Sequence, residues 1–197
     1  SHQCIEDLSL MRAIPGMTVI VPADAKEARK ATLALAEFRG PAYMRLGRLA
    51  VESVTDSIPS YKFELGKGAT LRDGTDVTII AVGMNVQMAL AAAEKLAAEG
   101  IDVEVIDPRT IAPLDKDTIF NSIRKTHRAA VVEESNKTAG IGAELAAMFQ
   151  EELYDELDGP VARIAALDVP MPYNIAMEHY SIPDVNRICA SIRAMMD

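Results

Sequence analysis

The chain has 197 residues, of which 49% are hydrophobic, so it can bury one large domain or one domain and part of another. Its formal net charge of -9 argues against a nucleic-acid surface or an anionic-membrane surface, and its apolar stretches are too short to span a bilayer. Two distant cysteines, Cys4 and Cys189, form no metal-spaced pair and no disulfide framework, which favours a reducing cytoplasm.

The first fifty residues predict two helices that alternate with two strands. Pro15-Gly16 is typical of a helix end, and Asp24 is placed to cap the second helix. The strand–helix–strand spacing predicts a right-handed parallel crossover. The expected helices span residues 5–14 and 25–38, and the expected strands span residues 18–21 and 42–46.

A stretch of different composition follows at residues 51–74. It carries one proline and three glycines, mixes both signs of charge and shows no clear period. We interpret it as a linker with short strands at residues 62–65 and 69–71. It separates a partial domain, residues 1–50, from a second domain, residues 75–197.

The second domain returns to a regular alternation of strands and helices. This order predicts an α/β fold with an open, mostly parallel sheet and helices on both faces. Asp115 and Asp184 are placed to cap two of the helices. The expected strands span residues 77–82, 103–106, 129–132 and 161–165, and the expected helices span residues 86–98, 115–126, 140–153 and 185–195.

Two motifs at strand ends invite a functional interpretation that their context does not favour. Gly140-Ile141-Gly142 lies between a strand and a helix, but it is not a G-x-G-x-x-G motif and lacks an acidic residue at the ribose distance. We interpret it as a close approach of helix and sheet. Glu133-Glu134 could do acid–base chemistry, but such a pair more often caps the next helix or faces a subunit interface.

Other polar residues also favour structural roles. Asp107 and Arg109 follow a strand at the edge where α/β sites lie, and an ion pair that fixes the loop is the favoured interpretation. His127 and His179 have no partners at metal-ligand spacing, so we expect no metal site.

His2 is the first of two residues that the pattern marks for substrate chemistry. It stands beside Gln3 and one turn ahead of Glu6 and Asp7. An imidazole there could donate to a substrate carbonyl or hydroxyl, while a carboxylate sets its tautomer. On spacing alone, this catalytic role and an ordinary surface position are equally supported for His2.

Arg48 is the second such residue. Arg45 and Arg48 lie on opposite faces of an ideal strand, so only one can enter a given pocket unless the chain turns at Gly47. A turn at Gly47 would free the Arg48 guanidinium for a phosphate group. A surface salt bridge is the alternative.

The amino-terminal motifs resemble a known family. Residues 1–7 and 11–24 resemble the pyrimidine-binding domain of transketolases, and residues 40–48 resemble the same family's next strand. The resemblance implies that His2 is a catalytic residue beside the thiamine ring and that Arg48 binds the substrate phosphate. Arg45 has no such role in the family. Cys4 stands where the family commonly has Pro or Ala, and its role stays open.

The second domain resembles the carboxy-terminal domain that transketolases share with the β subunits of 2-oxo acid dehydrogenases. Residues 106–115 and 132–144 are typical of both, whereas residues 168–173 resemble the dehydrogenase β subunits more closely. The implied fold is the last part of a pyrimidine-binding domain followed by a complete carboxy-terminal domain. The family's cofactor-activating glutamate lies upstream of the motifs matched here, and its diphosphate motif lies in another domain. We therefore expect this chain to be the back part of a larger enzyme.

The resemblance implies an enzyme that uses thiamine diphosphate and Mg²⁺ when complete, with no cofactor or metal held by this chain alone. Our first expectation is a transketolase-like transferase that moves a two-carbon ketol unit between sugar phosphates. The alternatives are a β subunit of a 2-oxo acid dehydrogenase and a non-catalytic dimerisation module. The expected partner is a second copy or a polypeptide that supplies the missing cofactor site, and the isolated chain is expected to be inactive.

Overall fold

The amino-terminal part forms a small α/β unit. The structure is a computed structural model that describes residues 4–56, 58 and 61–196. Its first elements are α1 (Asp7–Arg12), β1 (Thr18–Ile20), α2 (Ala25–Glu37) and β2 (Ala42–Met44). β1 and β2 pair in parallel with Thr18 opposite Ala42, as the strand–helix–strand spacing predicts. Asp24 caps α2 by accepting a hydrogen bond of 2.8 Å from the Glu27 amide.

A strand from the second half of the chain completes this small sheet. β6 (Thr110–Ala112) pairs antiparallel with the free side of β1, which gives the order β2-β1-β6. The sequence pattern did not predict β6, because three residues beside two prolines give no strand period. The two halves of the chain therefore share a sheet, while the boundaries at residues 50 and 75 stay predictions.

The larger sheet confirms the predicted α/β architecture. Its order is β3-β5-β4-β7-β8, and all neighbouring strands are parallel except β3, which is antiparallel to β5. Branched residues such as Ile79 and Val105 are fully buried, as expected for strands covered on both faces. The strands are β3 (Ala69–Arg72), β4 (Val77–Ala81), β5 (Val103–Asp107), β7 (Ala129–Asn136) and β8 (Ala162–Ala166).

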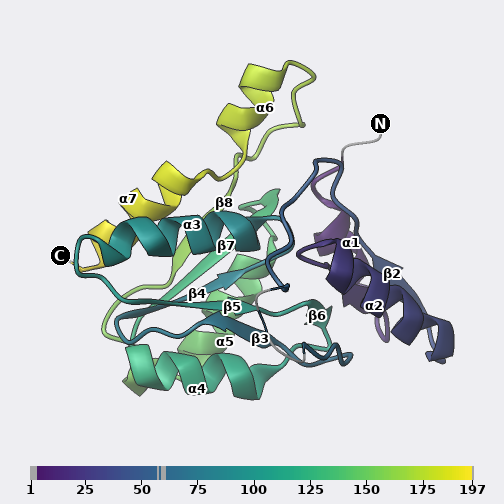
Figure 1. Cartoon of the computed structure of the whole chain (residues 1–197), viewed down its shortest axis with the longest axis horizontal. Helices are drawn as coiled ribbons and strands as arrows, with labels where there is room; N and C mark the ends of the chain where they lie inside the picture. Colours follow the sequence, from purple (N-terminus) through teal and green to yellow (C-terminus); the bar gives the residue numbers. More distant parts are fainter. Residues whose placement is uncertain (1–3, 57, 59–60, 197) are drawn as a thin grey trace.

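Helices cover both faces of the large sheet (Figure 1). α3 (Asn85–Ala97) and α7 (Val185–Met196) pack on one face, where they enclose a core with β4, β5 and β8. α4 (Lys116–Thr126) and α5 (Ile141–Glu152) cover the other face. The core on that face also includes Leu8 of α1 and Val19 of β1, so the amino-terminal unit packs into the core of the second domain.

Three further details differ from the sequence expectation. The predicted strand at residues 62–65 is wrong, because that backbone instead accepts a hydrogen bond from the Arg109 side chain and forms a turn closed by Lys67. A 3₁₀ turn, Tyr154–Glu156, and α6 (Ile175–Ser181) were not predicted. α6 projects away from the sheet at the top of Figure 1.

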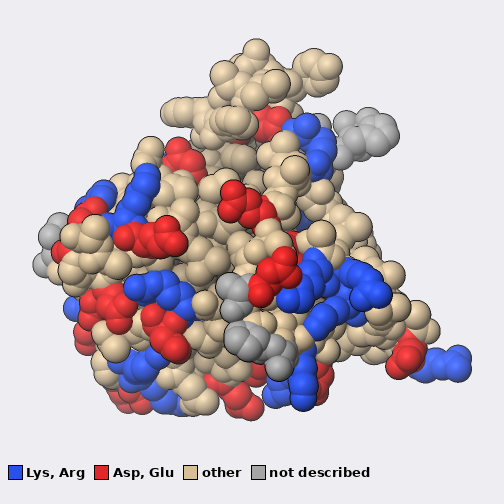
Figure 2. Space-filling model, in the orientation of Figure 1, with Lys and Arg blue, Asp and Glu red and all other residues tan. Residues whose placement is uncertain are grey.

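The first part of the predicted linker lies against the start of α2, while its last part forms β3 of the large sheet. The Thr55 amide and hydroxyl donate to Asp24 Oδ2 at 2.8 and 2.7 Å, and the Tyr61 hydroxyl donates to Glu27. The segment is therefore fixed to the amino-terminal end of α2. Acidic and basic side chains are interspersed on the face seen in Figure 2. Within the described parts of the chain, no helix combines the length and the apolar content needed to cross a membrane.

Candidate functional site

A polar cavity of about 300 Å³ lies where α1, the loop after β2, the end of β7 and α6 meet. It joins the two motifs that the sequence analysis selected, because Cys4 at the start of the described chain and Arg48 both line it. His2 itself lies outside the described residues, so its position stays a prediction. The charged side chains that line the cavity are Asp7, Arg45, Arg48, Glu134 and Glu178.

Arg45 anchors one wall of this cavity. Its Nε lies 3.4 Å from Asp7 Oδ2 and its Nη2 lies 3.0 Å from Glu134 Oε2. The Tyr43 hydroxyl donates to the same Asp7 oxygen at 2.7 Å. Burial and this hydrogen bond raise the pKa of Tyr43 to about 12, so the phenol keeps its proton. These contacts tie α1, β2 and β7 together, which the sequence did not predict for Arg45.

Arg48 lines the same cavity. Its side chain is 55% exposed, and Nη2 donates to Glu178 Oε1 at 2.5 Å. The salt bridge that the sequence left as the alternative is thus present. Both arginines line the cavity because β2 ends at Met44 and the chain then leaves strand geometry. The phosphate role of Arg48 stays a prediction.

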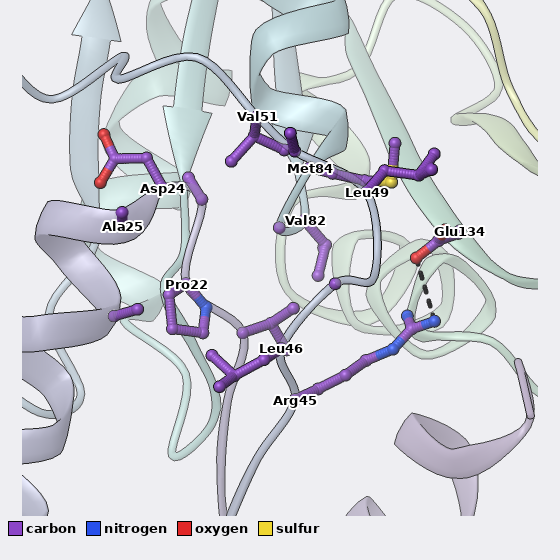
Figure 3. Close-up of a pocket in the computed structure, with 16 residues that line it drawn as sticks. Pro22, Asp24, Ala25, Arg45, Leu46, Leu49, Val51, Val82, Met84 and Glu134 are labelled. Carbon is purple, nitrogen blue, oxygen red and sulfur yellow. Dashed lines mark ion pairs between the residues drawn. The ribbon is translucent and has the colours of Figure 1, made fainter. Parts of the chain in front are cut away.

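The loop between the two arginines also walls a second, more apolar cavity (Figure 3). This cavity measures about 320 Å³, and the Arg45–Glu134 ion pair lies at its rim. Its apolar wall comes from the ends of β1 and β4 and from the residues after β2. The labelled apolar side chains are Pro22, Ala25, Leu46, Leu49, Val51, Val82 and Met84.

Glu133 is a helix cap, as the sequence interpretation favoured. Its carboxylate accepts hydrogen bonds from the amides of Ile141 at 2.9 Å and Gly142 at 2.8 Å. A Cβ at Gly140 would lie 2.6 Å from both Glu133 carboxylate oxygens. Because the glycines have no side chains, the Glu133 carboxylate can reach the amino terminus of α5. This confirms the predicted close approach of helix and sheet. Burial raises the pKa of Glu133 to about 7.

Asp107 and Arg109 belong to a buried structural cluster. Asp107 Oδ1 accepts a hydrogen bond of 2.9 Å from the Arg109 amide. The Arg109 guanidinium lies 3.3 Å from Glu27 Oε1, stacks 4.8 Å from the Tyr61 ring centroid and donates to the Lys62 carbonyl. Burial, together with the nearby Glu27 charge, raises the pKa of Asp107 well above its ordinary value. The structural interpretation is supported, but the ion pair joins Arg109 to Glu27 rather than to Asp107, which accepts from the Arg109 backbone amide.

His127 and Cys4 each have a local hydrogen-bond partner. His127 Nδ1 lies 2.9 Å from the Glu156 carbonyl at the end of α4, a packing role. The Cys4 thiol donates to Glu6 at 3.0 Å, and this bond raises the pKa of Cys4. Among the described residues, no three metal-ligating side chains come together.

Sequence reasoning missed the contribution of residues 168–182 to the cavity. Met171 and Glu178 both line it. The available signal was Asn174, whose side chain caps α6 by accepting hydrogen bonds from the amides of Ala176 and Met177 at 3.0 and 3.3 Å. α6 has only seven residues, too few for a clear helical period.

Known proteins match nearly the whole chain. The pyrimidine-binding domain of transketolase matches residues 1–53, and the transketolase C-terminal domain matches residues 66–188. The β subunit of acetoin:2,6-dichlorophenolindophenol oxidoreductase from Bacillus subtilis (strain 168) is 35% identical over 91% of this chain and 53% of its own length. The mitochondrial pyruvate dehydrogenase E1 component subunit beta-2 from Oryza sativa subsp. japonica is 43% identical over 89% of this chain and 48% of its own.

A solved structure shows the same arrangement of elements. It is described as a split gene transketolase, an inactive beta4 tetramer, and it superimposes with a TM-score of 0.87 at 36% identity over 99% of this chain and 62% of that one. The chain spans about half the length of the two curated relatives named above. On these matches, the chain belongs to the transketolase C-terminal domain family of thiamine-diphosphate enzymes.

Proposed function

We propose that this chain is the β-type part of a thiamine-diphosphate enzyme of the 2-oxo acid dehydrogenase class. The observation that carries the proposal is that about 90% of this chain matches β subunits, with identities of 35% and 43% for the two relatives described above. The segment of residues 168–173, which resembles those subunits, supports it further because Met171 lines the polar cavity. Ketol transfer, our first expectation from sequence, has less support from the names of the curated relatives.

In this proposal the chain supplies positioning and charge. Arg48 binds the terminal oxyanion of the substrate, and Arg45 fixes the wall beside it through Asp7 and Glu134. His2 donates a proton or a hydrogen bond to a substrate oxygen. Thiamine diphosphate and Mg²⁺ belong to the complete enzyme, where the cofactor supplies carbon–carbon bond cleavage. A partner polypeptide or a further part of the same protein holds them, in a homo- or hetero-oligomer.

Ketol transfer between sugar phosphates is the second candidate. It is favoured by the position of Arg48, whose half-exposed guanidinium lines a polar cavity together with the end of the His2 motif. The match to a protein described as a split gene transketolase supports the same reading. A sugar-phosphate enzyme needs such an arginine, whereas an acyl-transferring enzyme can do without it.

Reconstitution of the complete enzyme tests the proposal. The chain and its cofactor-binding partner, with thiamine diphosphate and Mg²⁺, should decarboxylate pyruvate or a branched 2-oxo acid and reduce an artificial electron acceptor. Ketol transfer from xylulose 5-phosphate to ribose 5-phosphate, with no reaction of 2-oxo acids, would overturn the proposal in favour of the second candidate. A His2→Ala variant should lose activity in either case, and full activity would remove His2 from the site.

A non-catalytic role in dimerisation is the third candidate, supported by the description of the solved relative as an inactive beta4 tetramer. If it holds, neither activity appears in the reconstituted complex and the isolated chain still self-associates. Gel filtration of the isolated chain measures this, and a clean monomer would count against it.

A further inference from the structure

α6, which the sequence did not predict, brings the Glu178 carboxylate to Arg48, the arginine proposed above to bind the substrate. Resting on the anion-binding role of Arg48 proposed above, we propose that Glu178 is a specificity-determining residue. It holds the Arg48 guanidinium as an internal counter-anion that the terminal oxyanion of a substrate must displace. The oxyanion is a carboxylate or a phosphate, which share the chemistry that a guanidinium recognises.

The two members of this ion pair differ in how firmly they are held. The Glu178 side chain is only 13% exposed, against 55% for Arg48. The Glu178 amide donates to the Asn174 carbonyl at 2.8 Å, and the Glu178 carbonyl accepts from the Ile182 amide at 3.2 Å, so its backbone is held within α6. The guanidinium is therefore the part that can exchange partners while the carboxylate stays in place.

The other carboxylates of the cavity are already engaged. Asp7 and Glu134 both pair with Arg45, and Asp7 also accepts from Tyr43. Among the described residues, Arg48 is the one cation that pairs with Glu178. The release of Arg48 therefore leaves the Arg45 wall unchanged and affects a single ion pair.

The charge balance of the cavity makes Glu178 selective. Two arginines, Arg45 and Arg48, face three carboxylates, Asp7, Glu134 and Glu178, which leaves one net negative charge. An entering anion must overcome this charge as well as the existing ion pair. A group that engages both arms of the guanidinium can do so, whereas a weak or poorly oriented monoanion is rejected.

Equilibrium binding to the full chain tests the proposal. Ribose 5-phosphate and pyruvate serve as the two oxyanion probes, with ribose as the uncharged control, and calorimetric titrations are run at fixed ionic strength. Replacing Glu178 by Gln should tighten binding of at least one oxyanion about fivefold, the value of one partly exposed ion pair. Binding of ribose should not change. The probe that gains more identifies the preferred oxyanion.

Matched variants separate this effect from general charge. Glu152→Gln removes an equally short ion pair, with Lys116 at 2.6 Å, on a different part of the surface and should leave oxyanion binding unchanged. Adding Arg48→Ala to Glu178→Gln should abolish the gain. An equal gain in Glu152→Gln, a gain that survives loss of Arg48, or no oxyanion binding by Glu178→Gln would each overturn the role of Glu178.

Failure of this inference is distinct from failure of the proposed function. If the reconstituted enzyme is active and Arg48→Ala weakens its substrate binding, but Glu178→Gln does not change it, only the role of Glu178 is wrong. If the Glu178→Gln gain is present but neither activity appears, the proposed function is wrong and the anion site remains.

Discussion

Arg109 and Arg48 each follow a strand, yet their environments are opposite. Arg109 is 6% exposed and contacts a carboxylate, an aromatic ring and a backbone carbonyl. Arg48 is half exposed and pairs with one carboxylate across a cavity. A buried arginine with several partners is fixed in place and structural, whereas a half-exposed arginine with a single exchangeable partner is available to a ligand.

Removing the buried arginine should give the largest effect. Arg109→Met should lower the free energy of unfolding by about 3–5 kcal/mol, because it leaves the fully buried Glu27 carboxylate without its charge partner. Urea unfolding followed by circular dichroism measures the change. Adding Glu27→Gln should recover part of the loss, since the uncompensated charge is then gone. A loss below about 1 kcal/mol would mean that Arg109 is no more structural than Arg48.

The comparison of buried and exposed charged groups extends to the pH dependence of stability, through the adjacent residues Glu133 and Glu134. Folding raises the pKa of Glu133 from 4.5 to about 7, so the folded state binds its proton more tightly. Stability should therefore fall as pH rises from 4.5 to about 7, by about 3 kcal/mol from this group.

Two variants, Glu133→Gln and Glu134→Gln, test whether this pH dependence belongs to Glu133. Glu133→Gln cannot ionise, so its unfolding free energy should lose this decline with pH, whereas Glu134→Gln should keep it. The measurement is a set of urea unfolding curves between pH 4.5 and 7.5. An unchanged slope in Glu133→Gln would assign the pH dependence to another group.

Local pattern accounts for most of the fold. Asp24 and Gly140 mark helix starts that the structure shows, and the buried strands of the large sheet follow from their apolar runs. β6 was missed because its three residues become a strand only by pairing with β1. The burial of Glu27 was missed for a similar reason, since a carboxylate on a helix is ordinarily solvated and its charge partner, Arg109, is distant in the sequence.

The candidate site was less predictable than the fold. Arg48 could be selected from the turn residue before it, and Cys4 shows that the first motif reaches the same cavity. Glu178 lies 130 positions from Arg48 in the sequence, so no local pattern could connect them. Arg45 was assigned no role, yet its contacts with Asp7 and Glu134 build the cavity wall.

Tyr61 and Tyr43 allow a finer comparison of the buried Arg109 cluster with the polar cavity. Tyr61→Phe removes a hydroxyl that donates to buried Glu27 beside Arg109, and should cost about 1.5–3 kcal/mol of stability. Tyr43→Phe removes the donor to Asp7 beside Arg45, where the site is partly solvated, and should cost less, about 1 kcal/mol. Thermal and urea unfolding of both variants measure the difference. Equal costs would show that the two clusters are equally shielded from water.

The smallest expected effect on stability is that of Arg48→Ala. Its single, half-exposed ion pair should contribute no more than about 0.5–1 kcal/mol, and its loss leaves Glu178 near enough to solvent to stay hydrated. Urea unfolding beside Arg109→Met is the direct measurement. A loss of about 3 kcal/mol would show that Arg48 holds α6 to the amino-terminal unit, and the cavity would then be a domain contact. A loss near zero leaves the guanidinium free to exchange Glu178 for a ligand, since an interaction that stabilises the fold so little can be broken by an anion of ordinary affinity.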